Sequence, residues 1–392
     1  MKSVYKGDIM ACKTKIAIPQ THPIQHFCPQ FASYAKMPEI DLCVFFESDK
    51  GLKPYFDQNF KQEVNWSGID LSGFNHKFLT NTDIVEELTA FNPDIVVIYG
   101  YTHSIQKIAY RYAVKYKKKI LFVSDSELHQ KKNPIMELFK RVILHRYFTR
   151  VDYCLSVGDS NEDVYRSFGV DNGRLVRMYF PIDINFFNQL LIKKKSIREE
   201  IRLKYAIPSD TVILTTIGKL VPWKRQIDII HVLGELEKRG IKATAFIIGS
   251  GKDEEKLRRE NTKNTTNKSV LTGFVQPEDM ARYLCATDIY VHPAEVEPHS
   301  LAISEAIYCG CPVIISNRCG SYGPTDDVQP GRNGYVYQVG NIMNLADKIE
   351  FLTSHPSLLK EFSEASKNIG YNNQMLAHGG ALKNVINVIN TK

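Results

Sequence analysis

Strand-like apolar runs and helix-like stretches alternate from one end of this sequence to the other. Runs such as DIVVIYG (94–100) and TAFIIG (244–249) are apolar without interruption, which is typical of strands buried on both faces of a parallel sheet. The predicted strands are 15–19, 42–47, 94–100, 119–124, 153–157 and 175–180 in the first half, and 212–218, 244–249, 270–274, 288–292, 312–316 and 334–337 in the second. Two successive α/β sets predict two doubly wound, Rossmann-like domains.

The length of 392 residues also favours two domains, because single hydrophobic cores rarely grow that large. The boundary is expected within 181–210, where strand-like sequence gives way to a charged helix and a Pro-Ser-Asp turn. We predict a first domain over 1–185, a second over 186–373, and a last helix over about 374–392 that packs back on the first. Ligands of doubly wound sheets bind at the carboxyl ends of the strands, so the site is expected in a cleft between the domains.

The composition is that of a globular protein, with 43% apolar and 24% charged residues. No apolar run approaches the roughly 20 residues that span a bilayer, and the first twelve residues lack a signal-peptide core, so a cytoplasmic protein is expected. Eight cysteines are scattered without a C-x-x-C pair, which favours buried reduced thiols over a zinc site or disulfides.

The positive charge is concentrated in one segment. Residues 101–150 hold twelve Lys and Arg against three Asp and Glu, whereas the whole chain has a net charge of +7. A helix over 136–150 would place an apolar stripe of Leu138, Val142, Ile143 and Tyr147 beside the cations Lys140, Arg141, Arg146 and Arg150. A basic amphipathic helix suits an anionic membrane surface, here through residues 131–150, although a solvated basic face remains the alternative. Nucleic acid is not expected as a partner, because no known binding module accompanies the charge.

Two glycine-containing loops follow predicted strands of the second half. The loop GKLVPWK begins at Gly218 and places Lys219 and Lys224 where they can meet a diphosphate, although lysines after strands are often only surface residues. The loop IIGSGKDEEKL contains Gly249 and Gly251, but Glu254 occupies the third glycine position of a G-x-G-x-x-G motif. A nicotinamide-type fingerprint is therefore not supported, and either a close backbone approach or an ordinary turn remains.

The segment EPHSLAISEAIYCG (297–310) carries two glutamates eight residues apart. Ser300 is a good N-cap and Gly310 a good C-cap for the short helix between them. Glu305 falls on an apolar face of that helix, where an unpaired carboxylate is costly, and Glu297 stands beside backbone N–H groups that suit an anion. The pair can hold a ligand that has both a phosphate and hydroxyls, or can be a capping carboxylate and a surface one.

Taken together with LTGFVQPEDMARYLCATDIYVHPAEVEPHSLAISEAIYCGCPVIIS, these loops resemble the donor-nucleotide half of the retaining glycosyltransferases of family four, which have the GT-B fold. The resemblance continues through Cys319-Gly320 and GRNG (331–334) to about residue 370. It implies transfer of a sugar from a nucleotide-sugar donor to an acceptor hydroxyl with retained anomeric configuration. It also implies no metal and no cofactor, since cationic side chains and helix N-termini offset the departing diphosphate.

The resemblance implies a role for each residue of the second half. Lys219, where the family usually has arginine, and Lys224 would neutralise the diphosphate. Glu297 would contact the sugar hydroxyls and Glu305 the ribose hydroxyls. The remaining donor-binding positions are the loop glycines Gly218, Gly249 and Gly251, the backbone of His299, Ser300 and Leu301 at the distal phosphate and sugar, and Phe274 and Val275 at the base. The family commonly has Phe-Gly where this chain has His299-Ser300, which would reshape the sugar pocket.

The first half is similar, in THPIQHFCPQF (21–31), FDQNFKQEVNW (56–66) and Gly73-Phe74, to a branch found in bacterial surface-polysaccharide pathways. His22 and Gln25 replace part of the usual glycine-rich loop, and His22 can approach donor phosphate or acceptor or be an ordinary loop histidine. Asp125, in SDSE (124–127), stands where many relatives have histidine and would polarise the acceptor hydroxyl. A helix cap, or a metal-binding D-x-E motif of the other glycosyltransferase fold, is the alternative for Asp125.

We therefore expect a metal-independent, retaining GT-B glycosyltransferase that moves a sugar from a nucleotide-sugar donor to a glycan or lipid-linked acceptor. Its place would be surface polysaccharide or glycoconjugate biosynthesis, in the cytoplasm or at the inner face of the plasma membrane. A GT-B sugar-nucleotide epimerase and a non-catalytic nucleotide-sugar-binding partner are the alternatives.

Overall fold

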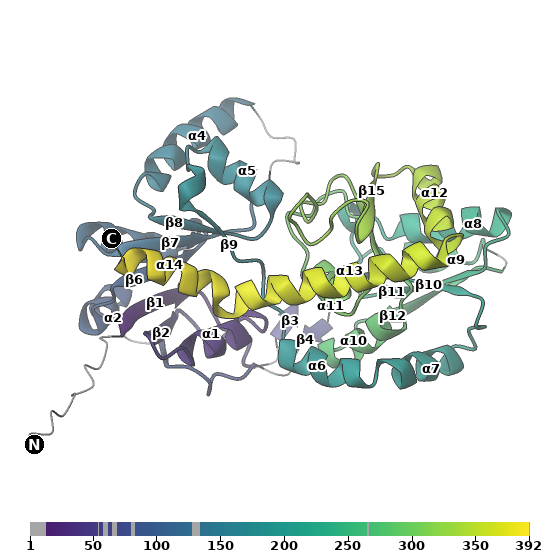
Figure 1. Cartoon of the computed structure of the whole chain (residues 1–392), viewed down its shortest axis with the longest axis horizontal. Helices are drawn as coiled ribbons and strands as arrows, with labels where there is room; N and C mark the ends of the chain where they lie inside the picture. Colours follow the sequence, from purple (N-terminus) through teal and green to yellow (C-terminus); the bar gives the residue numbers. More distant parts are fainter. Residues whose placement is uncertain are drawn as a thin grey trace, which may run out of the picture.

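Two parallel sheets, each with helices on both faces, make up the chain in the computed structural model (Figure 1). The structure describes residues 13–391 except 54, 58–61, 65–68, 80–82, 128–133 and 265. The seven-stranded sheet has the order β5-β2-β1-β6-β7-β8-β9, and the six-stranded sheet the order β12-β11-β10-β13-β14-β15. This confirms the predicted α/β class with two doubly wound sheets.

The first sheet is built from β1 (Thr14–Gln20), β2 (Ile40–Phe46), β5 (His76–Phe78), β6 (Ile95–Tyr99), β7 (Lys119–Val123), β8 (Tyr153–Ser156) and β9 (Leu175–Arg177). Its helices are α1 (Phe27–Ala35), α2 (Ile84–Phe91), α3 (Ser104–Lys115), α4 (Pro134–Phe148) and α5 (Asp159–Ser167). A small antiparallel pair, β3 (Tyr55–Asp57) and β4 (Gln62–Val64), stands apart from it.

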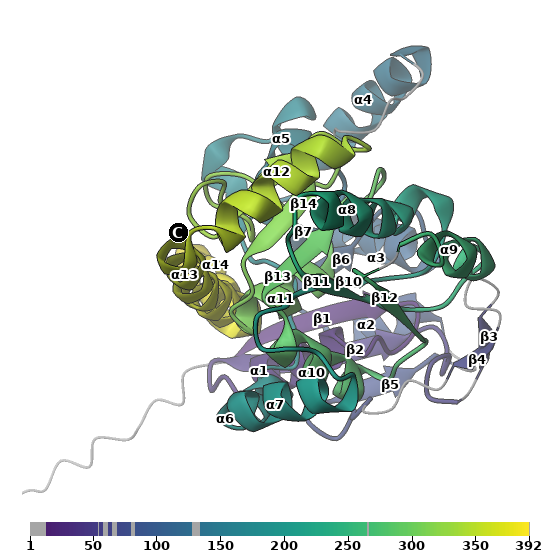
Figure 2. The ribbon, with the colours of Figure 1, turned by 90° about the vertical axis from the view of Figure 1, so that its right-hand side faces the viewer.

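The second sheet is built from β10 (Val212–Ile217), β11 (Ala243–Ile248), β12 (Ser269–Gly273), β13 (Ile289–His292), β14 (Val313–Ser316) and β15 (Gly334–Tyr337). The helices that follow the first sheet are α6 (Ile184–Ile192), α7 (Lys194–Lys204), α8 (Ile227–Lys238), α9 (Glu254–Asn261), α10 (Pro277–Ala286), α11 (Leu301–Tyr308), α12 (Ile342–Thr353), α13 (Pro356–Met375) and α14 (Ala381–Asn390). Figure 2 shows α8 and α12 on one side of this sheet and α6, α7 and α10 on the other.

All twelve predicted strands are present, and the central ones, such as β1 and β6, are continuous runs that both helix layers bury. Along β1, Ile16 and Ile18 pack into one core and Ala17 packs into the opposite one. The prediction for 175–180 was too long, since β9 ends at Arg177 and Tyr179 has a left-handed φ of 62°. The three strands that the sequence did not predict, β3, β4 and β5, have only three residues each.

The last two helices run across both sheets (Figure 1). Helix α13 packs against α11 of the second sheet, and α14 buries four apolar side chains in the core of the first, namely Ala381, Leu382, Val385 and Ile386. A turn over Leu376–Gly380 joins them, in which Gly379 has a φ of 139°. At the earlier crossing, Asp183 caps α6 and Phe187 packs into the second core, so the expected boundary at 185/186 falls inside α6.

Helix α4 contains no single apolar stripe along the predicted residues, which corrects that prediction. Leu144 and Phe148 are buried and Tyr147 stacks on Tyr110 at 4.0 Å between ring centroids, whereas Val142 and Ile143 are each 66% exposed. Leu138 and residues 131–133 lie outside the side chains that the structure describes. The helix thus buries one face in the first core and turns two aliphatic side chains outward.

The seven cysteines of the described part of the chain are all buried and free, and Cys12 lies outside it. None of the helices described is both long enough and apolar enough to cross a bilayer.

Candidate functional site

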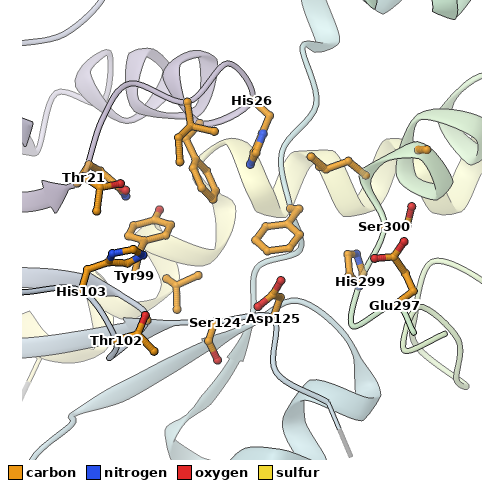
Figure 3. A pocket seen from close by; sticks show the side chains of 18 of the residues that line it. Thr21, His26, Tyr99, Thr102, His103, Ser124, Asp125, Glu297, His299 and Ser300 are labelled. Carbon is orange, nitrogen blue, oxygen red and sulfur yellow. The ribbon is translucent and has the colours of Figure 1, made fainter. Parts of the chain in front are cut away.

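A cavity of about 630 Å³ opens between the carboxyl ends of the two sheets (Figure 3). The loops after β1, β6 and β7 line one side of it, and the loops after β10 and β13 with the start of α11 line the other. Strand order reverses next to β1 in the first sheet and next to β10 in the second, and crevices at such reversals are where doubly wound sheets bind ligands. The cavity therefore lies where the sequence predicted a cleft.

Glu297 projects into this cavity from the loop before α11 and is only 8% exposed. Its Oε2 accepts from both Lys224 Nζ and His292 Nε2, the latter at 3.0 Å. Burial acts to raise the pKa of the Glu297 carboxyl, but the hydrogen bond from His292 and the charge of Lys224 outweigh it and lower that pKa. The side chain is thus an ionised carboxylate at neutral pH.

His292 was not singled out from the sequence, although it ends β13 five residues before Glu297. It is 2% exposed, and its second ring nitrogen, Nδ1, lies 3.3 Å from the hydroxyl of Tyr290. Burial lowers the pKa of His292 and outweighs the opposing effect of Glu297. The sequence feature that could have identified His292 is a histidine at the end of a predicted strand, shortly before the first glutamate.

Glu305 lies on the apolar side of α11, as its spacing predicted. Burial raises the pKa of its carboxyl to about 8. Among the residues that the structure describes, none makes a hydrogen bond or ion pair with this carboxyl, and Tyr290 is one of its neighbours. Glu305 is therefore a protonated group at neutral pH without a partner among the described residues, and it is not one of the residues that line the cavity.

The N-terminus of α11 offers fewer free amides than predicted. Ser300 is the N-cap residue, but its side chain does not cap the helix and its N–H donates to Ser321 Oγ at 3.1 Å. The N–H groups of Leu301 and Ala302 make no hydrogen bond within the described part of the chain, and both residues line the cavity. An anion at this helix would meet those two amides rather than that of Ser300.

His299 also lines the cavity and is held by a buried acidic pair. Its Nε2 lies 3.3 Å from Asp327 Oδ2 in an ion-pair contact without hydrogen-bond geometry, and both side chains are 1% exposed. Burial opposes protonation of His299, but Asp327, then Asp326 and Asp125, outweigh it and raise its pKa. The ring of Phe180 meets the imidazole edge-on at 5.4 Å.

The predicted loop glycines are explained by close packing of two loops. A Cβ on Gly249 would lie 2.0 Å from the carbonyl oxygen of Gly218, and one on Gly251 would lie 2.4 Å from that of Leu220. Both glycines also have positive φ, which disfavours other residues. Of the two lysines, Lys224 lines the cavity and Lys219 does not.

Phe274 and Val275 follow β12, whose last residue Gly273 has a φ of 73°. Neither side chain is among those lining the cavity, and Val275 packs partly against the core of the second sheet. Their expected role at the base stays a prediction.

The first-sheet side of the cavity contains Asp125, which is exposed and faces His299 across the cleft in Figure 3. The helix-cap alternative for Asp125 is not supported, since the next helix described begins at Pro134. His22 and Gln25 instead line a side cavity of about 110 Å³. The cleft holds two histidines that the sequence analysis did not select, His26 and His103, and burial lowers the pKa of His26 to about 4.

No group of three or more His, Cys, Asp or Glu side chains that could hold a metal occurs in the described ranges. The absence of a metal and of a cofactor from the reaction stays a prediction.

Residues 197–369 match the model of the family "Glycosyl transferases group 1". A poly(ribitol-phosphate) alpha-N-acetylglucosaminyltransferase of Staphylococcus aureus is 31% identical over 40% of this chain and 31% of its own length. A GDP-mannose-dependent mannosyltransferase of Corynebacterium glutamicum, acting on monoacylated phosphatidylinositol monomannoside, is 29% identical over 45% and 46%. The chain thus spans less than half the length of these two curated relatives.

Two solved structures match nearly the whole chain. A glycosyltransferase from Rickettsia africae covers 97% of it and 100% of its own chain, with a TM-score of 0.71 and 15% identity. Anabaena Alr3699/HepE in complex with UDP has the same coverage, a TM-score of 0.70 and 17% identity. At such low identity these likenesses show the fold.

Proposed function

We propose that this chain, which has the GT-B fold and whose residues 197–369 match the model of the group 1 glycosyltransferases, transfers a sugar from a nucleotide-sugar donor to an acceptor hydroxyl. The observation that carries the proposal is the arrangement of Lys224, Glu297 and the free amides of α11 around one cavity between the sheets. A cation and helix amides suit a departing diphosphate, and a carboxylate beside them suits sugar hydroxyls. Relatives that act in teichoic acid and glycolipid synthesis favour a surface-polymer or glycoconjugate acceptor.

The proposed reaction retains the anomeric configuration and uses no metal. The glycosidic oxygen of the diphosphate leaves with the bonding electron pair, and the acceptor hydroxyl attacks the sugar from the same face. Asp125, opposite His299, is the group on the first-sheet side that can polarise that hydroxyl. Glu305 is proposed to hold the ribose hydroxyls, and Lys219 with Lys224 to meet the diphosphate.

Thermal stabilisation by a panel of UDP-glucose, UDP-N-acetylglucosamine, UDP-galactose and GDP-mannose tests donor binding. Release of nucleoside diphosphate is then followed with and without candidate acceptors in the presence of EDTA. Release that depends on acceptor and survives EDTA supports the transferase, and nuclear magnetic resonance of the product shows whether the configuration is retained. An interconverted sugar nucleotide would instead support an epimerase, and binding without any turnover a non-catalytic protein.

We further propose that α4 docks the enzyme on an anionic membrane. Its outward side chains include the aliphatic Val142 and Ile143 and the exposed cation Arg146, and the exposed Arg150 follows two residues after its end, so apolar insertion and charge attraction coincide at one helix. Figure 2 shows α4 projecting beyond the rest of the molecule. Residues 131–133 of the predicted surface lie outside the described residues.

Flotation with vesicles of phosphatidylcholine, with and without phosphatidylglycerol, tests this docking. Binding should require the anionic lipid and fall on replacing Val142 and Ile143 by serine or Arg146 and Arg150 by glutamine. The matched control replaces Arg258 and Lys263 on the second-sheet side by glutamine and should bind as the parent does. Equal flotation of all three variants would overturn the proposal.

A further inference from the structure

The Glu297 carboxylate has one oxygen occupied and one open. Oε2 meets both Lys224 Nζ and His292 Nε2, whereas no hydrogen bond or ion pair from the described residues reaches Oε1. The residue lines the cavity, so Oε1 is the atom that a donor sugar hydroxyl can reach. Which way this oxygen points depends on what holds Oε2.

Of the two groups that contact Glu297 Oε2, only His292 is expected to stay bound to it when the donor binds. Lys224 also lines the cavity and, if the proposed function holds, it must turn toward the diphosphate when the donor binds. His292 is fully enclosed at the end of β13, and its ring stacks at 24° on that of Tyr290, with 6.1 Å between centroids. The histidine can therefore keep Glu297 in place after the lysine leaves.

The ionised Glu297 decides which nitrogen of His292 carries the proton. A neutral imidazole has one N–H donor and one acceptor nitrogen. Glu297, 3.0 Å from Nε2, can only accept a hydrogen bond, whereas the Tyr290 hydroxyl, 3.3 Å from Nδ1, can donate one. In a neutral ring both contacts are satisfied together when the proton is on Nε2 and Tyr290 donates to Nδ1.

We propose that His292 is a positioning residue for Glu297 that donates from Nε2 and leaves Glu297 Oε1 to the donor sugar, and that Tyr290 keeps the His292 ring neutral by donating to its Nδ1. The inference rests on the proposed function in that Glu297 contacts the donor sugar. The proposal adds two buried side chains, His292 and Tyr290, to the site, although neither contacts the donor or the acceptor. The arrangement is a carboxylate, a histidine and a third group in line, in which the carboxylate sets the tautomer and the third group satisfies the other ring nitrogen.

The first test reads the tautomer directly and needs no substrate. ¹⁵N-histidine labelling with long-range ¹H–¹⁵N spectra distinguishes the two neutral tautomers and the imidazolium, and His292→Gln identifies the His292 signals. At pH 7 we expect the proton on Nε2 in the parent protein, and a larger share of imidazolium in Tyr290→Phe, in which Nδ1 has lost its hydroxyl donor. A proton on Nδ1, or an imidazolium, in the parent protein would overturn the proposal.

The second test separates positioning from packing by using the best donor of the panel. His292→Leu removes the donor to a charged acceptor and should lower kcat/KM for the donor about 10- to 100-fold, while calorimetric affinity for UDP or GDP changes less than about twofold. His292→Gln, whose amide can donate at a similar place, should recover most of the loss, and Tyr290→Phe should fall between. The control is Tyr337→Phe, because the buried Tyr337 hydroxyl has no hydrogen-bond partner among the residues that the structure describes.

Equal losses in His292→Leu and His292→Gln, or a loss of UDP and GDP affinity as large as that of kcat/KM, would show a structural role instead. If the parent protein turns over no donor, the proposed function fails, but the tautomer measurement still decides the role of His292.

Discussion

The carboxylate of Asp326 accepts the backbone N–H of Asp159 at 2.6 Å and so joins the second sheet to the N-terminus of α5 beside the first. The Asp159 carboxylate returns the contact by accepting the N–H of Thr325 at 2.9 Å. The adjacent residue, Asp327, holds His299 in the cavity. The loop that contains Asp326 and Asp327 thus connects the two sheets and also holds His299 in the second-sheet wall of the cleft.

Replacing Asp326 by alanine should lower the free energy of unfolding by about 1–3 kcal/mol, because the partly buried amide of Asp159 and the buried amide of Asp327 lose their acceptor. Urea unfolding at pH 6 measures this, with Asp163→Ala as the exposed-carboxylate control. An unchanged midpoint would contradict the interdomain role.

The free energy of unfolding should also decrease as pH rises, because Asp326 loses its proton. Burial raises its pKa from 3.8 to about 7, so the folded state binds the proton more tightly than the unfolded state. The contribution is fully present below about pH 4 and is lost progressively toward pH 7. Asp326→Asn should reduce this loss between pH 4 and 7, as measured by thermal unfolding, and an identical pH profile would count against it.

Glu305→Gln should separate stability from binding. Because burial raises the Glu305 pKa from 4.5 to about 8, ionising it is unfavourable in the folded state, and glutamine removes that penalty. The ligand-free variant should be the more stable protein at pH 8, yet bind UDP or GDP about 10-fold more weakly if the carboxyl holds the ribose. Tighter nucleotide binding by the variant would exclude the ribose role.

Gly251→Ala should destabilise the loop that follows β11. Its Cβ would lie 2.4 Å from the carbonyl oxygen of Leu220, at a φ of 157°. Gly240→Ala is the matched control, since Gly240 has a φ of 73° but no atom within 4 Å of the added Cβ. We expect a loss of about 1–3 kcal/mol beyond the control, together with weaker nucleotide binding. Equal effects of the two substitutions would mean that close packing does not explain this glycine.

Asp125→Asn should lower acceptor-dependent release of nucleoside diphosphate about 10²-fold or more while nucleotide affinity stays within about twofold. The reason is that Asp125 follows β7 on the first-sheet side of the cavity, whereas Lys224 and α11 belong to the second-sheet side. Full activity of the asparagine variant would leave acceptor activation to another group of the cleft.

The sequence was informative about those features that depend on residues close together in the chain. Apolar runs predicted every strand of five or more residues, and the glutamates of the α11 segment were assigned correctly to the mouth and the apolar side of a short helix. The helix-like stripe in α4 was misread, because amphipathic spacing does not say which neighbour buries a side chain. Tyr147 stacks on Tyr110, whereas Val142 and Ile143 are exposed.

What the sequence alone determined is therefore the alternation of strands and helices, and with it the cleft at the carboxyl ends of two parallel sheets. The tertiary structure decided which groups meet in that cleft. Asp159 and Asp326 are 167 residues apart in the chain. The Ser321 hydroxyl accepts the N–H of Ser300 that was expected to face the ligand. His22 lies in a side cavity, whereas His103 lines the cleft. The physical reason is that strand and helix patterns come from local periodicity, whereas hydrogen bonds, burial and pKa shifts depend on neighbours that only folding brings together.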